Sequence, residues 1–506
     1  MSYRQRENLP LLAVVSTTTT ILLGFWIGFY RRVTTTGVAN RNDRAETHGR
    51  IKRRLPNTQA EAKCLQPLDL PCGLLLQNRI LRAAAFGGSD IESLLQSHVE
   101  VARGGVAMTT VAYAAVSRDG MTFANQLLLD HDDHKMLKDL QRLAKAVHKA
   151  GSKLSIQLAH AGSFADRKIT KTQQLAPSRV FNPAGFDFAR EMTLQDMDRV
   201  AADYVNAAKM AQRAGCDAIE LHCGHGYLLS QFLSPKTNPR TDAFGGKHID
   251  NRLRFPLRVL HDIRQAVGPR FAILVKMNLS DGFHGGLTPE DAQIAAIEFA
   301  KASADALVLS GGFTSRNGFY MLRGKTPYWS MARALGGTKG LAVLLFGWWL
   351  VPQIRFEECF FLEEARHVLQ ALVAASSNVP VCLVGGVVSL SAIEGCLDEG
   401  FELVQMARAL IQNPNMVNDI RQSLPTTSVS IATTHHEKNG HDLNTTTRPD
   451  TTLQNDNDKN TNAKKNILSG CTHCNECVIS TLDASRGMHC PIKDQRSDVS
   501  NTHLSW

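Results

Sequence analysis

The strongest constraint on the fold is a repeated alternation of short β-branched or apolar runs and longer amphipathic runs between residues 78 and 414. This alternation is typical of a parallel sheet whose strands are joined by crossover helices. Eight strands are expected, near residues 79–85, 105–110, 153–158, 217–222, 271–277, 304–310, 379–385 and 402–406. Eight strand–helix units close naturally into a barrel. We therefore expect an α/β fold of the (β/α)8 TIM-barrel class over residues 66–423.

Local sequence at the expected helix starts agrees with this alternation. Thr193 and Asp196 have the spacing of a capping box, and Thr288 stands directly before Pro289. An open doubly wound sheet is the alternative fold. Such a sheet usually has fewer strands and a glycine-rich first turn, whereas the first strand here runs into Ala84-Ala85-Phe86. A closed barrel is the better prediction.

The basic residues are concentrated at the N-terminus. The chain carries a net charge of +9, and residues 1–60 hold ten Arg or Lys against three Asp or Glu, which accounts for +7 of that charge. The rest of the chain is nearly neutral and has no electrostatic footprint for DNA or RNA. We expect a small-molecule substrate and no nucleic-acid partner.

Residues 9–30 form an uncharged stretch that is rich in aromatic residues near its end and is followed at once by Arg31 and Arg32. Its length spans a bilayer as a helix, and aromatic residues favour the membrane interface. We expect a retained single-pass anchor between a short tail (1–8) and a basic linker (31–65), with the barrel on the cytoplasmic side. A cleaved signal peptide and a mitochondrial leader are the alternatives, and the Arg- and Thr-rich residues 31–54 favour the leader.

Two segments depart from the alternation. Residues 336–354 contain an apolar and aromatic run that is too short to span a membrane. A packed excursion from the barrel is the simplest interpretation, and a cover for the active site or contact with a lipid surface are alternatives. Residues 424–468 are rich in Thr, Asn, Asp and Lys with almost no large apolar side chains, so we expect a disordered linker before a Cys-rich tail at 469–506.

Polar residues gather where the fourth expected strand ends. That strand runs into His222, His225 follows three residues later, and Tyr227 comes next. Catalytic groups of (β/α)8 barrels lie at the C-terminal ends of the strands. Two imidazoles at this spacing can converge on one oxygen, and a nearby phenol can supply a proton. A lone His here would more often be structural, so it is the pair with Tyr227 that indicates catalysis.

These residues belong to a longer series of motifs. The run from His222 to Leu228 is followed by Gln231-Phe232-Leu233-Ser234-Pro235, Asn238-x-Arg240-x-Asp242, Gly245-Gly246 and Asn251-Arg252. The series resembles the Old Yellow Enzyme family of FMN-dependent ene-reductases. The likeness extends over nearly the whole barrel, through Gln157 to Gly162, Ser310 to Gly312, Val384 to Gly386 and Met406 to Leu410. As a set, these motifs are highly specific.

The resemblance implies a flavin role for several matching residues. In this family the glutamine matching Gln157 hydrogen-bonds the flavin pyrimidine, and a cation on strand five stabilises negative charge at the N1–O2 edge of the ring. That cation is usually Arg, and the matching residue here is Lys276, which keeps the charge but loses the planar fork. The phosphate-binding turns after strands seven and eight are matched by Gly385, Gly386, Ala407 and Arg408. A structural role for the glycines stays open.

The resemblance also implies a reaction in two halves. NAD(P)H reduces bound FMN, and the flavin then passes hydride to the β-carbon of an alkene conjugated to a carbonyl group. His222 and His225 would bind the carbonyl oxygen, and Tyr227 would protonate the α-carbon. The chain departs from the family pattern at Ala84-Ala85-Phe86 after strand one and at Val111-Ala112-Tyr113 after strand two, and neither segment is assigned a cofactor role.

The cysteines fall into two groups. Seven of the 11 are scattered singly, which fits a reducing compartment and no disulfide framework, and four lie together in the tail: Cys471, Cys474, Cys477 and Cys490. The tail resembles that of the dienoyl-CoA-reductase branch of the family, where four cysteines hold a [4Fe–4S] cluster, although the third cysteine comes one residue later there. A cluster, zinc and free thiols are the alternatives. The function alternatives are a dienoyl-thioester reductase or demethylase and a membrane-tethered flavin-binding protein without turnover.

Overall fold

The computed structural model describes residues 55–88, 90–130, 132–182, 187–350, 353–425, 466–479 and 489–491, and the structural statements below refer to these residues. The expected anchor at residues 9–30 and most of the expected linker lie outside them. The cytoplasmic placement of the barrel therefore stays a prediction. Among the described helices, none combines the length and the apolar character needed to cross a membrane.

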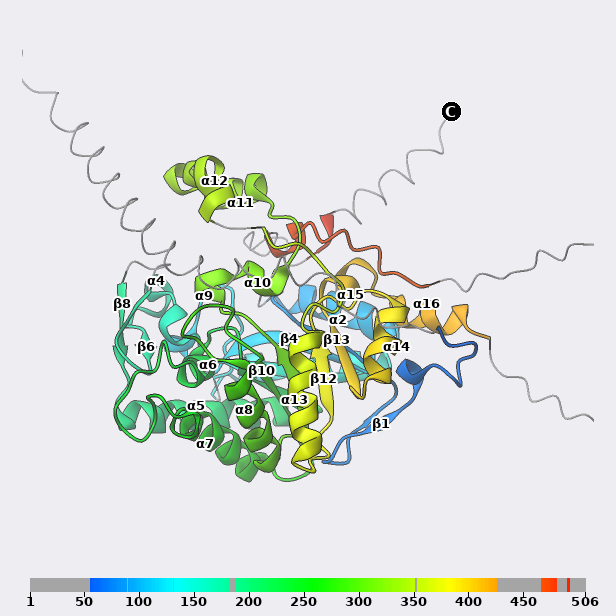
Figure 1. Cartoon of the computed structure of the whole chain (residues 1–506), viewed down its shortest axis with the longest axis horizontal. Helices are drawn as coiled ribbons and strands as arrows, with labels where there is room; N and C mark the ends of the chain where they lie inside the picture. The colour runs from blue at the N-terminus through cyan, green and yellow to red at the C-terminus, as the bar shows by residue number, and fades with distance from the viewer. Residues whose placement is uncertain are drawn as a thin grey trace, which may run out of the picture.

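Eight parallel strands close into a barrel, which confirms the predicted fold class (Figure 1). In the order of the chain, the strands are β3 (Ile80–Ala85), β4 (Met108–Ala115), β5 (Lys153–Ala159), β9 (Ala218–Cys223), β10 (Ala272–Asn278), β11 (Ala306–Ser310), β12 (Val381–Val384) and β13 (Leu403–Met406). Each observed strand overlaps its predicted range. Closure comes from the pairing of β13 with β3, with Val404 in register with Ile80.

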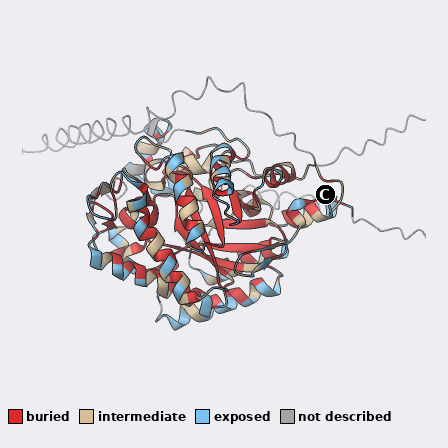
Figure 2. Cartoon of the chain, turned by 60° about the horizontal axis from the view of Figure 1, so that its bottom comes forward, coloured by how far each residue is buried: buried red, intermediate tan, exposed pale blue. Residues whose placement is uncertain are grey.

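Amphipathic helices surround the barrel and bury one face each against it, so that red strands lie inside two-toned helices in Figure 2. They are α2 (Ile91–Arg103), α3 (His134–Lys149), α5 (Leu194–Arg213), α7 (Ile249–Val267), α8 (Pro289–Lys301), α13 (Leu362–Ala374), α14 (Leu390–Asp398) and α16 (Met416–Ser423). The predicted capping box of Thr193 and Asp196 is present at the start of α5. Thr288 caps α8, and Pro289 is its first residue.

The N-terminal end of the barrel is closed by a small hairpin of β1 (Leu68–Asp69) and β2 (Leu75–Leu76). Leu70 and Leu76 from this hairpin pack with Ala218, Ala272 and Ala306 at the starts of three barrel strands. The chain already packs on the barrel before the hairpin, since the backbone N–H of Cys64 donates to buried Glu394 on α14. An open cavity can therefore form only at the other end.

The C-terminal end of the barrel carries the additional elements. They are the 3-10 turns Arg118–Gly120 and Gly162–Phe164, the strands β6 (Leu175–Ala176), β7 (Val180–Asn182) and β8 (Asp187–Glu191), and the helices α4 (Arg167–Thr170), α6 (Leu228–Leu233), α9 (Thr314–Asn317), α10 (Phe319–Leu322), α11 (Tyr328–Leu335), α12 (Gly337–Leu350), α15 (Arg408–Gln412) and α17 (Glu476–Ile479). A further 3-10 turn, Lys63–Leu65, lies against α14 instead. The described part of the tail contacts the barrel: the carbonyl oxygen of Ile467 accepts a hydrogen bond from the backbone N–H of Leu390.

The pair α11 and α12 stands away from the barrel in Figure 1. The interpretation of residues 336–354 as a packed excursion is wrong for most of its large side chains. Leu341, Leu345 and Trp348 are 57%, 56% and 70% exposed. The reason is that no other described element covers α12 on the sides that α11 leaves open.

Candidate active site

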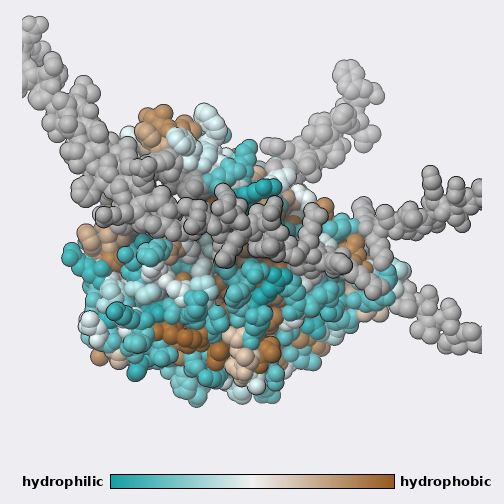
Figure 3. Space-filling view, viewed as in Figure 1, coloured by the Kyte–Doolittle hydropathy of each residue, from teal (hydrophilic) through white to brown (hydrophobic). Residues whose placement is uncertain are grey.

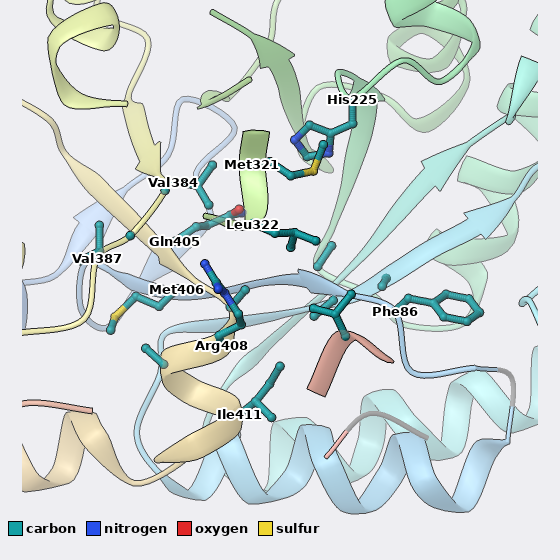
Figure 4. Close-up of a pocket in the computed structure, with 18 of the residues that line it drawn as sticks. Phe86, His225, Met321, Leu322, Val384, Val387, Gln405, Met406, Arg408 and Ile411 are labelled. Atoms are coloured by element: carbon teal, nitrogen blue, oxygen red, sulfur yellow. The ribbon is translucent and has the colours of Figure 1, made fainter. Parts of the chain in front are cut away.

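A cavity of about 280 Å³ lies at the C-terminal end of the barrel (Figure 4). Its lining includes every residue that the sequence indicates for catalysis or flavin binding: Gln157, His222, His225, Tyr227, Lys276, Gly385, Gly386, Ala407 and Arg408. These residues come from the ends of β5, β9, β10, β12 and β13, or from the loops that follow. The closed barrel brings together side chains that are far apart in the sequence.

The two predicted catalytic histidines lie side by side with perpendicular rings. Their ring centroids are 4.9 Å apart and the interplanar angle is 88°. His222 is the fifth residue of β9, whereas His225 lies in the following loop with a positive φ of 59°. The backbone of that loop is held by Asn278, whose side-chain oxygen accepts from the N–H of His225 at 2.9 Å. The end of β10 therefore fixes the second histidine relative to the first.

Both imidazoles are neutral at physiological pH. Burial lowers the pKa of His225 to about 3, with Lys276 as a second cause. The pKa of His222 also lies well below its usual range, because of burial and then because of His225 and Lys276. The Nδ1 of His222 accepts from the N–H of Gly224 at 3.3 Å, so its proton is on Nε2. A neutral imidazole N–H can donate to a carbonyl oxygen without carrying a full charge.

These depressed pKa values predict a loss of stability on acidification. An unfolded histidine has a pKa of about 6.5, so below that pH the unfolded chain binds more protons than the folded one, and stability falls as the pH falls. We expect replacement of His222 and His225 with Asn to flatten the fall in urea-unfolding midpoint between about pH 7 and about pH 5. Asn tolerates the positive φ at position 225. A slope equal to that of the parent protein would contradict the assignment.

Tyr227 lies next to the histidine pair within an aromatic wall. Its ring centroid is 4.8 Å from that of His222 and 4.9 Å from that of Tyr113. Burial and Tyr113 raise the pKa of Tyr227 well above its usual range, so its phenol keeps its proton. Phe86 packs on Tyr113 at 5.5 Å between centroids and also lines the cavity.

Phe86 and Tyr113 have no role predicted from the sequence, although both lie in segments that depart from the family pattern. The structure places the two rings in the wall of the cavity. The aromatic character of both positions, directly after strands one and two, is the signal that could have indicated them.

A buried polar network lies beside the histidine pair, because Lys276 is in register with His222 on the neighbouring strand. Glu220, which is 0% exposed, accepts from Gln157 Nε2 at 2.6 Å and from Gln405 Nε2 at 2.7 Å. Lys276 Nζ lies 3.3 Å from Glu220 Oε1 and 3.2 Å from Gln405 Oε1. Gln157, Lys276 and Gln405 line the cavity, whereas Glu220 contacts all three from behind.

Glu220 and Gln405 are the functional residues that sequence reasoning missed. Glu220 stands in an otherwise apolar strand, Ala218-Ile219-Glu220-Leu221, where a buried parallel strand is expected to be hydrophobic throughout. It is in register with Gln157 on the neighbouring strand, so the two side chains point to the same side of the sheet. The positive charge of Lys276 is therefore compensated by the buried carboxylate of Glu220 inside the barrel.

The turn after β12 is built from Gly385 and Gly386, which have φ values of 136° and 78°. A Cβ on Gly385 would lie 2.5 Å from the ring of Phe361, and one on Gly386 would lie 2.9 Å from the carbonyl oxygen of Glu357. Packing within the chain thus requires glycine at both positions. The structural role left open from the sequence is real, and both residues also line the cavity.

Arg408 lines the cavity but also binds the tail. Its Nη1 donates to the carbonyl oxygen of Arg323 at 3.0 Å and to Asn475 Oδ1. Asn475 is buried, and His473 stacks on Phe356 with centroids 3.4 Å apart. The tail therefore forms part of the cavity wall.

The residues of this cavity fit a bound flavin. One side offers a buried amide and a buried cation, Gln157 and Lys276, and another offers a glycine turn with Arg408 nearby. Between them the lining is largely apolar, including Ala112 and Met321. An apolar slot with a few convergent polar groups is the usual form of a cofactor site.

Three of the four tail cysteines, Cys471, Cys474 and Cys477, interact electrostatically with Arg408. Cys477 is influenced by Arg408 and by the thiols of Cys471, Cys474 and Cys490, and burial raises its pKa to about 12. Within the described residues, however, no three His, Cys, Asp or Glu side chains are grouped so that they could hold a metal ion. The described geometry thus gives no support to a cluster or a zinc site, which are two of the alternatives left open for the tail.

Comparison with known proteins agrees with the geometry. Residues 63–312 match the NADH:flavin oxidoreductase / NADH oxidase family. A 4,4'-dithiodibutanoate disulfide reductase of Rhodococcus erythropolis is 41% identical over 351 residues, which cover 68% of this chain and 85% of that protein. The chain belongs to the Old Yellow Enzyme family. Like its relatives, this family member is an NAD(P)H-dependent flavin oxidoreductase, as predicted.

Other relatives are longer than the shared region. An NADH oxidase of Thermoanaerobacter brockii is 32% identical over 355 residues, which cover 67% of this chain and 48% of that protein. The solved structure of an Old Yellow Enzyme homologue from Zymomonas mobilis matches with a TM-score of 0.55 at 20% identity, covering 72% of this chain and 95% of that one. The latter shows a shared fold. The likeness of the tail to the dienoyl-CoA-reductase branch stays a prediction.

Proposed function

We propose that this Old Yellow Enzyme family member reduces a C=C bond conjugated to a carbonyl group, with FMN as cofactor and NAD(P)H as electron donor. The observation that carries the proposal is the neutral, perpendicular pair of His222 and His225 with the protonated phenol of Tyr227 beside it, in one cavity with Gln157 and Lys276. The two histidines and Tyr227 suit a carbonyl substrate. Gln157 and Lys276 suit a flavin.

When bound, FMN supplies hydride transfer between the nicotinamide and the substrate. The protein residues do the rest. Neutral N–H donors on His222 and His225 would hold the carbonyl oxygen and stabilise the negative charge that develops there as the β-carbon receives hydride. Tyr227 would then donate its proton to the α-carbon, which leaves a saturated carbonyl compound.

Replacing Tyr227 with Phe is expected to slow turnover with an enone by about 10²-fold, because general acid catalysis typically contributes at least that much. Reduction of the bound flavin by NAD(P)H should be unchanged, since the phenol acts only on the second substrate. Rapid-mixing measurements of the two half-reactions check this. Tyr204→Phe is the control, because the Tyr204 hydroxyl accepts from the backbone of His160 outside the cavity lining. Equal effects of the two substitutions would remove Tyr227 from the mechanism.

The substrate class is tested by following NAD(P)H oxidation with a panel of cyclic enones, maleimides and saturated ketones. We expect turnover only with compounds whose C=C bond is conjugated to a carbonyl group, and the product should be the saturated carbonyl compound. Flavin that is reduced by NAD(P)H yet passes no electrons to any conjugated alkene would overturn the proposal.

An organic disulfide is the second candidate substrate. It is favoured by the relative from Rhodococcus erythropolis, which is named as a 4,4'-dithiodibutanoate disulfide reductase and is 41% identical to this chain. Hydride and a proton would cleave the S–S bond to give two thiols. Free thiol released from that dicarboxylate disulfide, measured beside the enone assay, distinguishes the two candidates.

The tail gives a third candidate, a dienoyl-thioester reductase or demethylase with an iron–sulfur cluster at Cys471, Cys474, Cys477 and Cys490. It rests on the sequence resemblance of the tail alone, since no group of side chains among the described residues is placed to hold a metal ion. Iron and zinc analysis of the purified full chain tests it, with Cys474→Ser as the comparison. Metal content near zero in both proteins would exclude this candidate.

A further inference from the structure

The projecting helices α11 and α12 form the main exposed apolar surface of the described structure. Of the 13 large hydrophobic side chains that are exposed there, seven belong to this hairpin: Trp329, Leu335, Leu341, Leu344, Leu345, Phe346 and Trp348. The hairpin projects beyond the largely teal surface of the barrel in Figure 3, where part of the projection is brown. An apolar patch of this kind on a folded protein normally marks an interaction site.

The way in which α12 packs on α11 leaves more than one of its faces uncovered. Gly347 approaches α11 closely, since a Cβ there would lie 2.8 Å from the ring of Tyr328. Gly340, seven residues earlier, lies against Ala332 of α11 in the same way. The bulky side chains point elsewhere, with Leu341 and Leu345 on one side of this contact and Phe346 on another.

This distribution favours a lipid surface over a protein groove. A partner groove covers one stripe of a helix, whereas a helix that is apolar on several faces is stable only in a core or in lipid. With 14 residues, α12 is shorter than the roughly 20 needed to span the bilayer. It can therefore enter only the interfacial layer, where tryptophan is favoured.

The charge around the hairpin points to an anionic surface. Residues 306–356 contain six cations and no Asp or Glu: Arg316, Arg323, Lys325, Arg333, Lys339 and Arg355. Lys325, Arg333 and Arg355 are exposed. Cations close to an anionic membrane strengthen binding to it. Apolar burial and charge complementarity thus act together at one end of the molecule.

We propose that the α11–α12 hairpin inserts into the interfacial layer of an anionic phospholipid membrane. The hairpin follows directly from α10, whose Met321 and Leu322 line the cavity, so the membrane would lie on the same side of the barrel as the cavity. This interaction is separate from the anchor expected at residues 9–30. Because such an anchor could by itself bind the chain to vesicles, the test must measure the contact of the hairpin with lipid.

The test places a single tryptophan at a known site in the full chain. Replacing Trp26, Trp329, Trp349 and Trp506 with Phe leaves Trp348, and its quenching is measured in vesicles of phosphatidylcholine and phosphatidylglycerol whose acyl chains carry bromine. The control protein replaces Trp348 with Phe as well and carries Val373→Trp. Val373 is 69% exposed at the end of α13, which leads back to the N-terminal end of the barrel.

We expect at least twofold quenching of Trp348, little quenching at position 373, and loss of the Trp348 effect in a Leu344→Asp, Leu345→Asp variant that keeps its far-ultraviolet circular dichroism. Pure phosphatidylcholine vesicles should quench Trp348 less. Vesicle-bound chain in which Trp348 is no more quenched than position 373 would overturn the proposal. So would a doubled molecular mass without vesicles that the double Asp variant abolishes, because the hairpin would then bind a second copy of the chain.

Discussion

Replacing both His222 and His225 with Ala is expected to slow enone reduction by about 10²–10³-fold, the loss typical of removing oxyanion donors. Both side chains line the cavity, and their rings are 4.9 Å apart. Neither is needed for the first half-reaction in this account. Reduction of the bound flavin by NAD(P)H should therefore continue, and reoxidation of that flavin by the enone should become rate-limiting.

His98→Ala is the matched control for this prediction. His98 is also buried and neutral, and its Nδ1 lies 2.7 Å from Thr109 Oγ1, outside the cavity lining. It should cost stability without changing either half-reaction. A His222→Asn, His225→Asn variant keeps neutral donors and should recover part of the lost rate. Enone turnover that survives the double Ala substitution would show that another group holds the carbonyl oxygen.

Replacing Glu220 with Gln is expected to lower the free energy of unfolding by about 3 kcal/mol, because it leaves the buried charge of Lys276 without its partner. It should also raise the reduction potential of the bound flavin. The reason is that an uncompensated cation in the cavity wall favours the form of the flavin that carries negative charge. Chemical unfolding and a dye-equilibration measurement of the potential check the two effects.

The control for Glu220 is Glu394→Gln. Glu394 is a buried glutamate that accepts from the backbone of Cys64, far from the network of Gln157 and Lys276. It should cost stability without moving the potential. A Glu220→Gln, Lys276→Met double variant removes both charges and should regain stability relative to Glu220→Gln alone. If the potential of the Glu220→Gln protein equals that of the parent, Glu220 has only a structural role.

The barrel could be predicted from the sequence because its strands and helices differ in local pattern. Strand β9 illustrates this point: Ala218–Cys223 is short and mostly apolar, and the predicted site residues His222, His225 and Tyr227 lie at its end or just after it. The predicted residues converge because strand ends in a closed barrel meet at one face, so that Gln157 and Arg408 line the same cavity. A residue that ends a strand in the sequence therefore lies at the C-terminal face of the barrel.

The counter-charge of Lys276 could not be predicted in the same way. It depends on which side chains point inward at the same level of neighbouring strands, and the register of Gln157 with Glu220 is set by the packing of the whole barrel. The aromatic wall of Phe86 and Tyr113 likewise depends on loop conformation. The exposure of α12 is only one of the alternatives that the sequence leaves open, because an apolar run favours burial without indicating what covers it.

The anaerobic absorption spectrum of the purified full chain shows whether the cavity holds a flavin that accepts and donates electrons. We expect one FMN per chain, loss of the oxidised flavin spectrum when NADH or NADPH is added, and its return when a conjugated enone follows. A chain that holds no flavin even after incubation with excess FMN would contradict the assignment of the cavity. Reduced flavin that an enone leaves unchanged would contradict the role given to His222, His225 and Tyr227.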